Sequence, residues 1–189
     1  MPVISLIGYT SSGKTTLFNL LTSENKETSS SLFTTLSTTT RWLKINNRDI
    51  GRGGSDKEVL LIDTVGFISR LPHYMIDAFK STLEESLAAD LILLLIDASE
   101  EIEDIRIKYE SCWDVLDELK VDKSKVFVIL SKFDSVSDPE EMKNDIANDL
   151  KISNPIAISS KTGYGIHKLK TIIGNHTYIV KLTNYYRNA

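Results

Sequence analysis

The stretch Gly8-Tyr9-Thr10-Ser11-Ser12-Gly13-Lys14-Thr15 decides the fold, because it has the form GxxxxGK[ST]. It follows an apolar run at residues 3–7 and opens a segment, residues 14–21, with a helical pattern. A glycine-rich loop between a strand and a helix is the setting in which this motif binds phosphate. Its glycines let backbone N–H groups turn towards phosphate oxygens, and the helix N-terminus adds positive potential. We therefore predict a phosphate site here; the alternative is a chance glycine-rich turn.

The last residues of this stretch have side chains suited to a nucleoside triphosphate and its cation. Lys14 places a positive charge against the β- and γ-phosphates. The hydroxyl of Thr15 is a hard oxygen ligand of the kind that Mg²⁺ prefers. The predicted site also includes Thr16, the next residue along the helix. Mg²⁺ is therefore the expected cofactor.

A second motif, Asp63-Thr64-Val65-Gly66, follows the apolar run at residues 59–62. A carboxylate at that strand end suits a Mg²⁺ ion bound through water, and the Gly66 N–H suits the γ-phosphate. An aspartate at a strand end is by itself more often a turn residue. Its place after an apolar strand, downstream of the phosphate loop, favours the functional interpretation.

Two short motifs indicate which base is bound. Ser131-Lys132-Phe133-Asp134 follows the strand-like run at residues 126–130 and resembles the NKxD element of GTPases, while Ser159-Ser160-Lys161 follows residues 156–158 and resembles their SAK element. A carboxylate at Asp134 accepts two hydrogen bonds from guanine, which adenine does not offer, and the Lys132 stem covers the base face. Each motif alone could be a solvated turn, but their order after separate strands favours guanine.

Ser131 departs from the asparagine of that element. A hydroxyl is shorter than a carboxamide and has fewer hydrogen-bond donors. Losing one neutral hydrogen bond costs ~1 kcal/mol. We therefore expect guanine binding to survive in weakened form.

The order of apolar segments predicts an α/β fold of the P-loop NTPase type. Strand-like runs alternate with helical patterns, which implies a mostly parallel sheet, six-stranded here, with helices on both faces. Residues 41–46 and 59–62 are joined by a short polar connection, so we expect the first of them to be the one antiparallel strand. Helical spacing is also clear at residues 76–87, at 102–119, from Pro139 and at 166–173.

Length and composition fit one globular domain. The chain has 189 residues, of which 41% are hydrophobic and 25% charged, with a net charge of −4. We expect a GTPase domain at residues 1–175 and a tail at 176–189 that leads to another domain; Tyr178, Val180 and Leu182 alternate as in a strand. The single cysteine, Cys112, is interpreted as a core residue. No run is long enough to span a membrane. The single cysteine fits a reducing cytoplasm, and a monomer is expected for the isolated domain.

The residues between the motifs resemble the HflX family of ribosome-associated GTPases. The resemblance rests on GYTSSGKTTLFNLL at the phosphate loop, on LFTTLSTTTR at residues 32–41, and on DTVGFI followed by LPH and FKSTLEE. It implies binding to the large ribosomal subunit and a missing N-terminal domain. It also implies that residues 32–41 form a switch that contacts the nucleotide, with Thr35 as a Mg²⁺ ligand. The residues assigned to GTP binding on this basis are Phe33, Thr34, Thr35, Leu36 and Ser37.

The predicted function is Mg²⁺-dependent GTP binding with slow hydrolysis. Phe67 stands where many GTPases have a glutamine that orients water, so no catalytic residue is assigned. A nucleotide-dependent binding module without turnover is the alternative. A P-loop kinase is disfavoured by the two guanine motifs. We also expect residues 28–40 and 67–73 to be ordered by the γ-phosphate.

Overall fold

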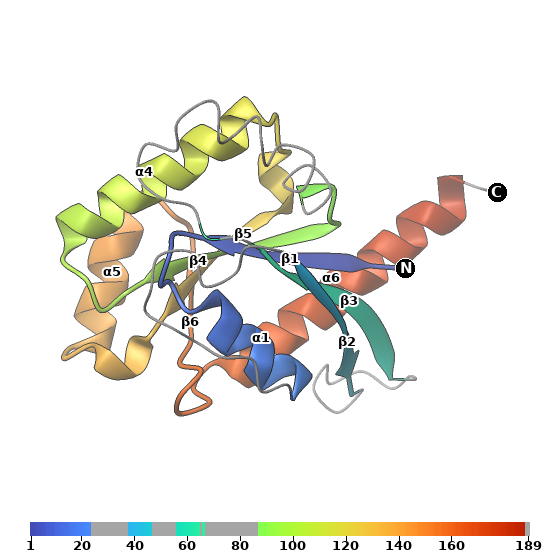
Figure 1. Cartoon of the computed structure of the whole chain (residues 1–189), viewed down its shortest axis with the longest axis horizontal. Helices are drawn as coiled ribbons and strands as arrows, with labels where there is room; N and C mark the ends of the chain where they lie inside the picture. The colour runs from blue at the N-terminus through green and yellow to red at the C-terminus, as the bar shows by residue number, and fades with distance from the viewer. Residues whose placement is uncertain (24–37, 47–55, 65, 67–86, 188–189) are drawn as a thin grey trace.

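The computed structural model describes residues 1–23, 38–46, 56–64, 66 and 87–187 of the chain. Its centre is a six-stranded sheet of order β2-β3-β1-β4-β5-β6 (Figure 1). The strands are β1 Val3–Gly8, β2 Thr39–Ile45, β3 Lys57–Asp63, β4 Leu91–Asp97, β5 Val126–Ser131 and β6 Ile156–Ala157.

The strand β2 is antiparallel to β3, and the other neighbouring strands are parallel. The prediction of one antiparallel strand in a mostly parallel sheet is confirmed. The strand begins earlier than expected, because Thr39 and Thr40 pair with Asp63 and Ile62 rather than belonging to the preceding loop. Threonine is β-branched and suits a ladder position, and this pairing takes the strand up to the end of β3.

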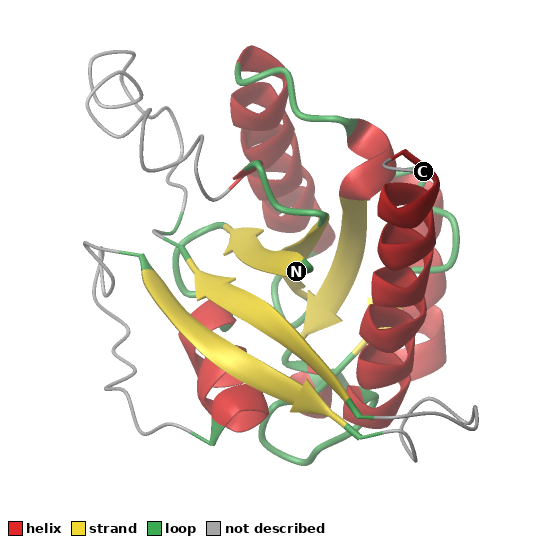
Figure 2. Cartoon of the chain, turned by 90° about the vertical axis from the view of Figure 1, so that its right-hand side faces the viewer, coloured by secondary structure: helices red, strands yellow, loops and turns green. Residues whose placement is uncertain are grey.

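Helices cover both faces of the sheet (Figure 2). They are α1 Lys14–Thr22, α4 Ile102–Glu118, α5 Pro139–Asp149 and α6 Ile166–Arg187, with short 3-10 turns η1 Lys123–Lys125 and η2 Phe133–Ser135. The predicted start of α5 is confirmed: Pro139 occupies its first turn, and the Asp138 side chain accepts a hydrogen bond from the Glu141 N–H. No described helix is long and apolar enough to cross a membrane.

The alternation along β4 explains the layered core. Leu91, Leu93 and Leu95 pack with α1 and α6 on one face of the sheet. Ile92 and Leu94 pack with α4 on the other. Both faces are covered, so the strand is apolar throughout until its last residue, as expected for a central parallel strand.

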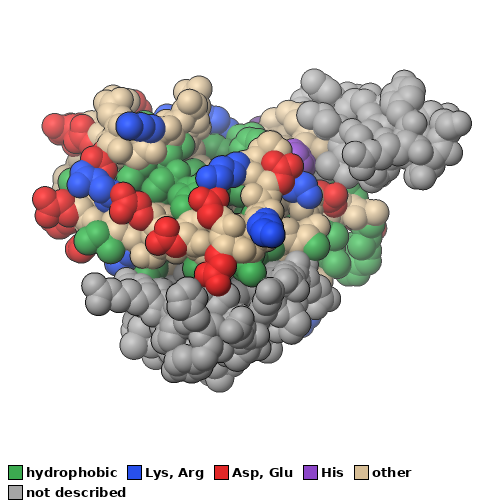
Figure 3. Space-filling model, turned by 90° about the horizontal axis from the view of Figure 1, so that it is seen from above, with side chains coloured by type: hydrophobic (Ala, Val, Ile, Leu, Met, Phe, Trp, Pro, Cys, Tyr) green, Lys and Arg blue, Asp and Glu red, His purple; other side chains and the backbone are tan. Residues whose placement is uncertain are grey.

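Cys112 is part of the core on the α4 face. Its side chain is 2% exposed, and burial raises the pKa of its thiol to about 12. The interpretation of Cys112 as a core residue is therefore confirmed. On the outer surface of the same side of the molecule, acidic and basic side chains are interspersed (Figure 3).

The helix α6 corrects the strand-like interpretation of Tyr178, Val180 and Leu182, because it continues to Arg187. A strand would need a neighbouring strand for its backbone hydrogen bonds, whereas a helix satisfies them internally. The part of α6 before this segment contacts the turn that leads into β4, where His176 Nε2 lies 2.9 Å from the Asp90 carbonyl oxygen. Of the helix predicted at residues 76–87, only Leu87 lies within the described part of the chain, and it is helical and buried.

Candidate functional site

The predicted site residues gather at the carboxyl edge of the sheet, where loops follow the parallel strands. The glycine-rich loop follows β1 and leads into α1, while the loops after β3, β5 and β6 carry the other motifs. Ligands of open α/β sheets bind at this edge. The tertiary structure therefore brings together four motifs that are far apart in the sequence.

The glycines of the first loop are required by its geometry. At Gly8, with φ +148°, a Cβ atom would lie 2.4 Å from the Leu95 carbonyl oxygen. At Gly13, φ is +90°, in the left-handed region that disfavours residues with a side chain. The backbone consequently wraps closely between β4 and α1, as expected of a loop that presents its N–H groups to an anion.

Lys14 is a buried cation at the start of α1. Its side chain folds back onto the loop, and its Nζ donates hydrogen bonds to the carbonyl oxygens of Tyr9, at 2.8 Å, and Gly8, at 3.1 Å. Burial lowers the pKa of Lys14 to about 8, although the nearby Asp63 carboxylate opposes this shift. A buried ammonium with neutral partners would gain from an anion placed beside it.

Two oxygen groups that could bind a hard cation lie side by side near this lysine. The Thr15 hydroxyl donates a hydrogen bond to Asp63 Oδ2 at 3.0 Å. The end of β3 is held in place because the Thr64 hydroxyl donates to the Leu6 carbonyl at 2.7 Å. A hydroxyl beside a carboxylate fits the oxygen chemistry that Mg²⁺ requires.

Gly66 approaches the phosphate loop closely. A Cβ atom at this position would lie 3.0 Å from both Lys14 Nζ and Thr10 Cα. A side chain at this position would require the lysine or the loop to shift by a few tenths of an ångström, which glycine avoids. The backbone of the second motif therefore lies beside the predicted phosphate site, as the sequence analysis expected of its N–H.

A hollow of about 270 Å³ lies beyond the phosphate loop, at the predicted base site. Its lining includes Gly13 and Thr16 from the phosphate loop and α1, together with residues from both predicted base motifs and Ser135, which follows the first of them. The lining residues that belong to the base motifs are Ser131, Lys132, Asp134, Ser160 and Lys161. The two base motifs are thus brought together with the end of the phosphate loop around one concave surface.

The Asp134 carboxylate is oriented by Ser159. The Ser159 hydroxyl donates to Asp134 Oδ1 at 2.6 Å and accepts hydrogen bonds from the N–H groups of Lys161 and Thr162. The hydrogen bond from Ser159 lowers the pKa of Asp134, and the charge of Lys161 acts in the same direction. Asp134 is therefore an ionised hydrogen-bond acceptor at neutral pH.

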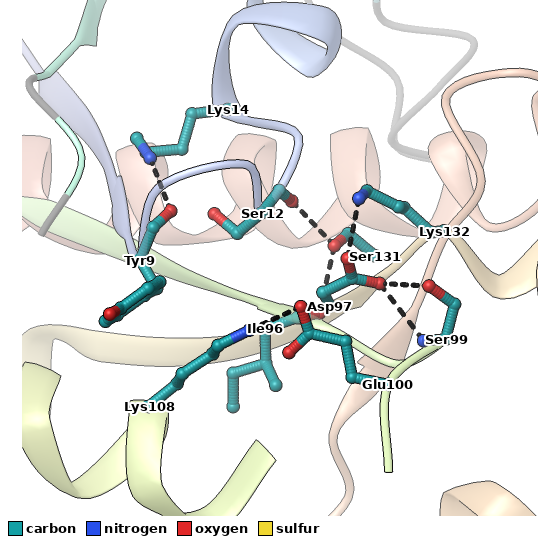
Figure 4. Close-up of polar contacts among 10 residues, drawn as sticks. All are labelled: Tyr9, Ser12, Lys14, Ile96, Asp97, Ser99, Glu100, Lys108, Ser131 and Lys132. Atoms are coloured by element: carbon teal, nitrogen blue, oxygen red, sulfur yellow. Dashed lines mark hydrogen bonds and ion pairs between the residues drawn. The ribbon is translucent and has the colours of Figure 1, made fainter. Parts of the chain in front are cut away.

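Ser131 joins the base motif to the phosphate loop. Its hydroxyl lies 2.7 Å from the Ser12 carbonyl oxygen and 2.9 Å from that of Ile96, and it has one hydrogen to donate to these two acceptors (Figure 4). The side chain is 3% exposed. Although a serine is shorter than the asparagine of the usual motif, its hydroxyl still reaches the loop.

Sequence reasoning missed Asp97. This residue ends β4, and its Oδ2 lies 2.6 Å from Lys132 Nζ (Figure 4). The available signal was an acidic residue directly after an apolar strand, the same pattern that pointed to Asp63. Predicted site residues outside the described part of the chain are Phe33, Thr34, Thr35, Leu36, Ser37 and Val65, as are Phe67 and most of the two segments expected to be ordered by phosphate.

Comparison with known proteins places these features in a family. Residues 3–132 match the family model described as 50S ribosome-binding GTPase. The chain is 42% identical over 175 residues to GTPase HflX of Methanocaldococcus jannaschii, and the aligned region covers 92% of the chain and 40% of that protein. It is 37% identical over 172 residues to GTPase HflX of Escherichia coli, which covers 89% of the chain and 37% of that protein. The chain thus spans about two fifths of the length of these relatives.

Solved structures show the same fold. A GTP-binding protein from Sulfolobus solfataricus in complex with GDP superposes with a TM-score of 0.68 at 27% identity, covering 94% of this chain and 53% of that one. A complex of SsGBP with GDP has a TM-score of 0.72 at 29% identity, covering 95% of this chain and 51% of that one.

Proposed function

The chain belongs to the family of 50S ribosome-binding GTPases, with HflX proteins among its relatives, and on this premise we propose that it binds GTP with Mg²⁺ and hydrolyses it slowly, as a switch that acts on the large ribosomal subunit. One observation carries the nucleotide part of the proposal. The hydrogen bond from Ser131 to Ser12 joins the base motif to the phosphate loop at 2.7 Å. A ligand that has both phosphates and a base would contact the phosphate loop and the base motif at the same time.

Each of these residues contributes a different interaction with the nucleotide or with Mg²⁺. Lys14 holds the β- and γ-phosphates, and Asp134 accepts hydrogen bonds from the guanine edge. Thr15 and Asp63 would hold Mg²⁺, which when bound neutralises charge on the phosphates. The backbone of Gly66 lies beside Lys14, so the Gly66 N–H would be placed to donate a hydrogen bond to the γ-phosphate. The attacking water has no assigned base among these residues.

Slow turnover is tested by phosphate release. We expect GTP hydrolysis on the order of 10⁻⁴ to 10⁻² per second, which is the range of GTPases without a partner or with one assisting arginine. The measurement is phosphate release under single-turnover conditions, with Lys14→Ala as the control that should give the no-protein rate. Tight GTP binding without release above that rate would support the alternative, a binding module without turnover.

The ribosomal partner is tested separately. We expect the protein to co-sediment with large ribosomal subunits more strongly when it is loaded with a non-hydrolysable GTP analogue than with GDP, since differential affinity for the two states is what makes a switch. Equal sedimentation in both states would argue against the switch. Because the chain spans about two fifths of the length of its relatives, a relative of full length should be tested in parallel.

Ser131→Ala should weaken guanine nucleotide binding moderately. The substitution removes the hydroxyl that links the two loops and leaves the Ser12 carbonyl without that donor. Loss of one buried hydrogen bond, at ~1 kcal/mol, corresponds to about fivefold weaker binding. Dissociation of a fluorescent GDP analogue measures it. A Ser124→Ala control, at an exposed position before β5 and outside the lining of the hollow, should bind as the wild type does.

Nucleotide affinity should depend on pH near the pKa of Lys14. This pKa is lowered to about 8 in the free protein, so above pH 8 the folded protein must take up a proton to present an ammonium to phosphate. Affinity should fall about fourfold between pH 7 and 8.5. The stability of the free protein changes with pH in the opposite direction. An uncharged Lys14 is easier to bury, so the free energy of unfolding should increase as the pH rises from about 8 towards the ordinary lysine pKa of 10.5. Calorimetry in buffers of different ionisation enthalpy measures the proton uptake; zero uptake at pH 8 would contradict the prediction.

We further propose that residues 1–175 form the GTPase domain and that 176–189 lead out of it towards another domain. The continuation of α6 past the sheet (Figure 1) supports a helical connection. Action on ribosomes would place the protein in the cytoplasm, and we propose that the isolated domain is a monomer, which light scattering would test.

A further inference from the structure

An ion pair lies where β4 and β5 end side by side. Asp97, the last residue of β4, is in register with Ser131, the last residue of β5. Lys132 follows directly, and its Nζ lies 2.6 Å from Asp97 Oδ2 (Figure 4). The Ala98 N–H donates to the Ser131 carbonyl at 3.1 Å, so the backbones of the two loops are also joined. Two loops from separate strands are thus tied together at the predicted base site.

The two partners of this ion pair are unequally constrained. The Asp97 side chain is 8% exposed, and its Oδ1 accepts hydrogen bonds from the Ser99 N–H, at 3.1 Å, and the Ser99 hydroxyl, at 2.6 Å. The Lys132 side chain is 40% exposed. A buried and already oriented carboxylate can therefore fix a side chain that would otherwise sample many rotamers, which reduces the entropy lost when a ligand packs against it.

Lys132 also borders the hollow in which the base is expected. Its backbone is left-handed, with φ +55°, a conformation that is uncommon for a residue with a side chain. The hydrogen bond from the Phe133 N–H to the Ile158 carbonyl holds this turn against the loop after β6. The side chain lines the hollow together with Asp134 while its ammonium is retained by Asp97.

We propose that Asp97 is a positioning residue for base recognition. By retaining the Lys132 ammonium, it holds the four-carbon stem as one apolar wall of the hollow, against which the planar face of a guanine base packs. This inference rests on the proposed function, because it concerns the same nucleotide. It adds a residue outside the nucleotide motifs, which acts through Lys132 and does not contact the ligand.

The test is a double-mutant cycle in nucleotide release. The variants are Asp97→Asn, which keeps the shape and removes the charge, Lys132→Met, which keeps an apolar stem and removes the ammonium, and the double variant. We expect Asp97→Asn to accelerate dissociation of fluorescent GDP and GTP by the same factor, because both nucleotides have the same base. The factor should be about fivefold, since solvent partly screens the ion pair between Asp97 and Lys132. In the Lys132→Met background, Asp97→Asn should change the rate by less than about twofold.

Controls separate positioning from general stability. Asp114→Asn removes a carboxylate from an exposed position of α4 and should release GDP as the wild type does. Dissociation within twofold of the wild type in Asp97→Asn, or an effect of full size in the Lys132→Met background, would overturn the proposal. If Asp97→Asn fails to fold by circular dichroism, Lys132→Met decides: a wild-type release rate in that variant also overturns it. Failure of the wild type to bind GDP would instead overturn the proposed function.

Discussion

Lys14→Ala is expected to weaken GTP and GDP binding by at least about 100-fold, which is the loss of two charge-assisted hydrogen bonds to phosphate. The side chain is 6% exposed, and its Nζ is held 2.8 Å from the Tyr9 carbonyl, at the start of the phosphate loop. Titration of a fluorescent nucleotide measures the loss.

The free Lys14→Ala protein should be at least as stable as the wild type. Because burial lowers the pKa of Lys14 to about 8, the charged form costs folding free energy at neutral pH, and alanine removes that cost. Thermal unfolding without nucleotide should therefore show an unchanged or higher midpoint. Lys168→Ala, at an exposed position of α6, is the matched control and should bind normally. Tight GTP binding by Lys14→Ala would overturn the role of this lysine.

Asp134→Asn is expected to change base preference. The carboxylate only accepts hydrogen bonds, and guanine has two donors on the edge that it would meet. Asparagine would keep the hydrogen bond from Ser159 through its carbonyl oxygen, and its amide N–H₂ would then oppose a donor, at a cost of roughly 1–3 kcal/mol. GDP affinity should fall by at least about tenfold. Xanthine has an acceptor at that position, so affinity for xanthosine diphosphate should rise.

Both nucleotides should be titrated against both proteins. Asp145→Asn, on the exposed side of α5, removes the same charge from a residue outside the lining of the hollow and should leave both affinities unchanged. If Asp134→Asn has the preference of the wild type, then Asp134 is a turn residue and most of the case for guanine is lost. The ionised state of Asp134 makes the comparison simple at neutral pH, because its pKa is lowered by Ser159.

Several structural features were predictable because they depend on local sequence patterns. The loop at residues 8–15 has glycine at two positions that disfavour a side chain, because a Cβ at Gly8 would lie 2.4 Å from the Leu95 carbonyl oxygen and φ at Gly13 is +90°. The continuous apolar run of β4 indicates a central strand, and the short link between β2 and β3 predicts their antiparallel pairing. The start of β2 and the extent of α6 were predicted less accurately. The residues that pair with Thr39 and the neighbours of α6 lie on other elements, so local sequence patterns do not show them.

By itself, the sequence determined the fold class, the phosphate loop and the residue types able to bind Mg²⁺ and guanine. These follow from spacing along one strand, turn or helix, where neighbours in sequence are neighbours in space. Only the tertiary structure decided how the motifs connect. Ser131 contacts Ser12, and Asp97 contacts Lys132, because parallel strands far apart in the chain end at the same edge of the sheet. Side chains that meet across strands leave no periodic signal in the sequence, since their distance is set by strand order and register.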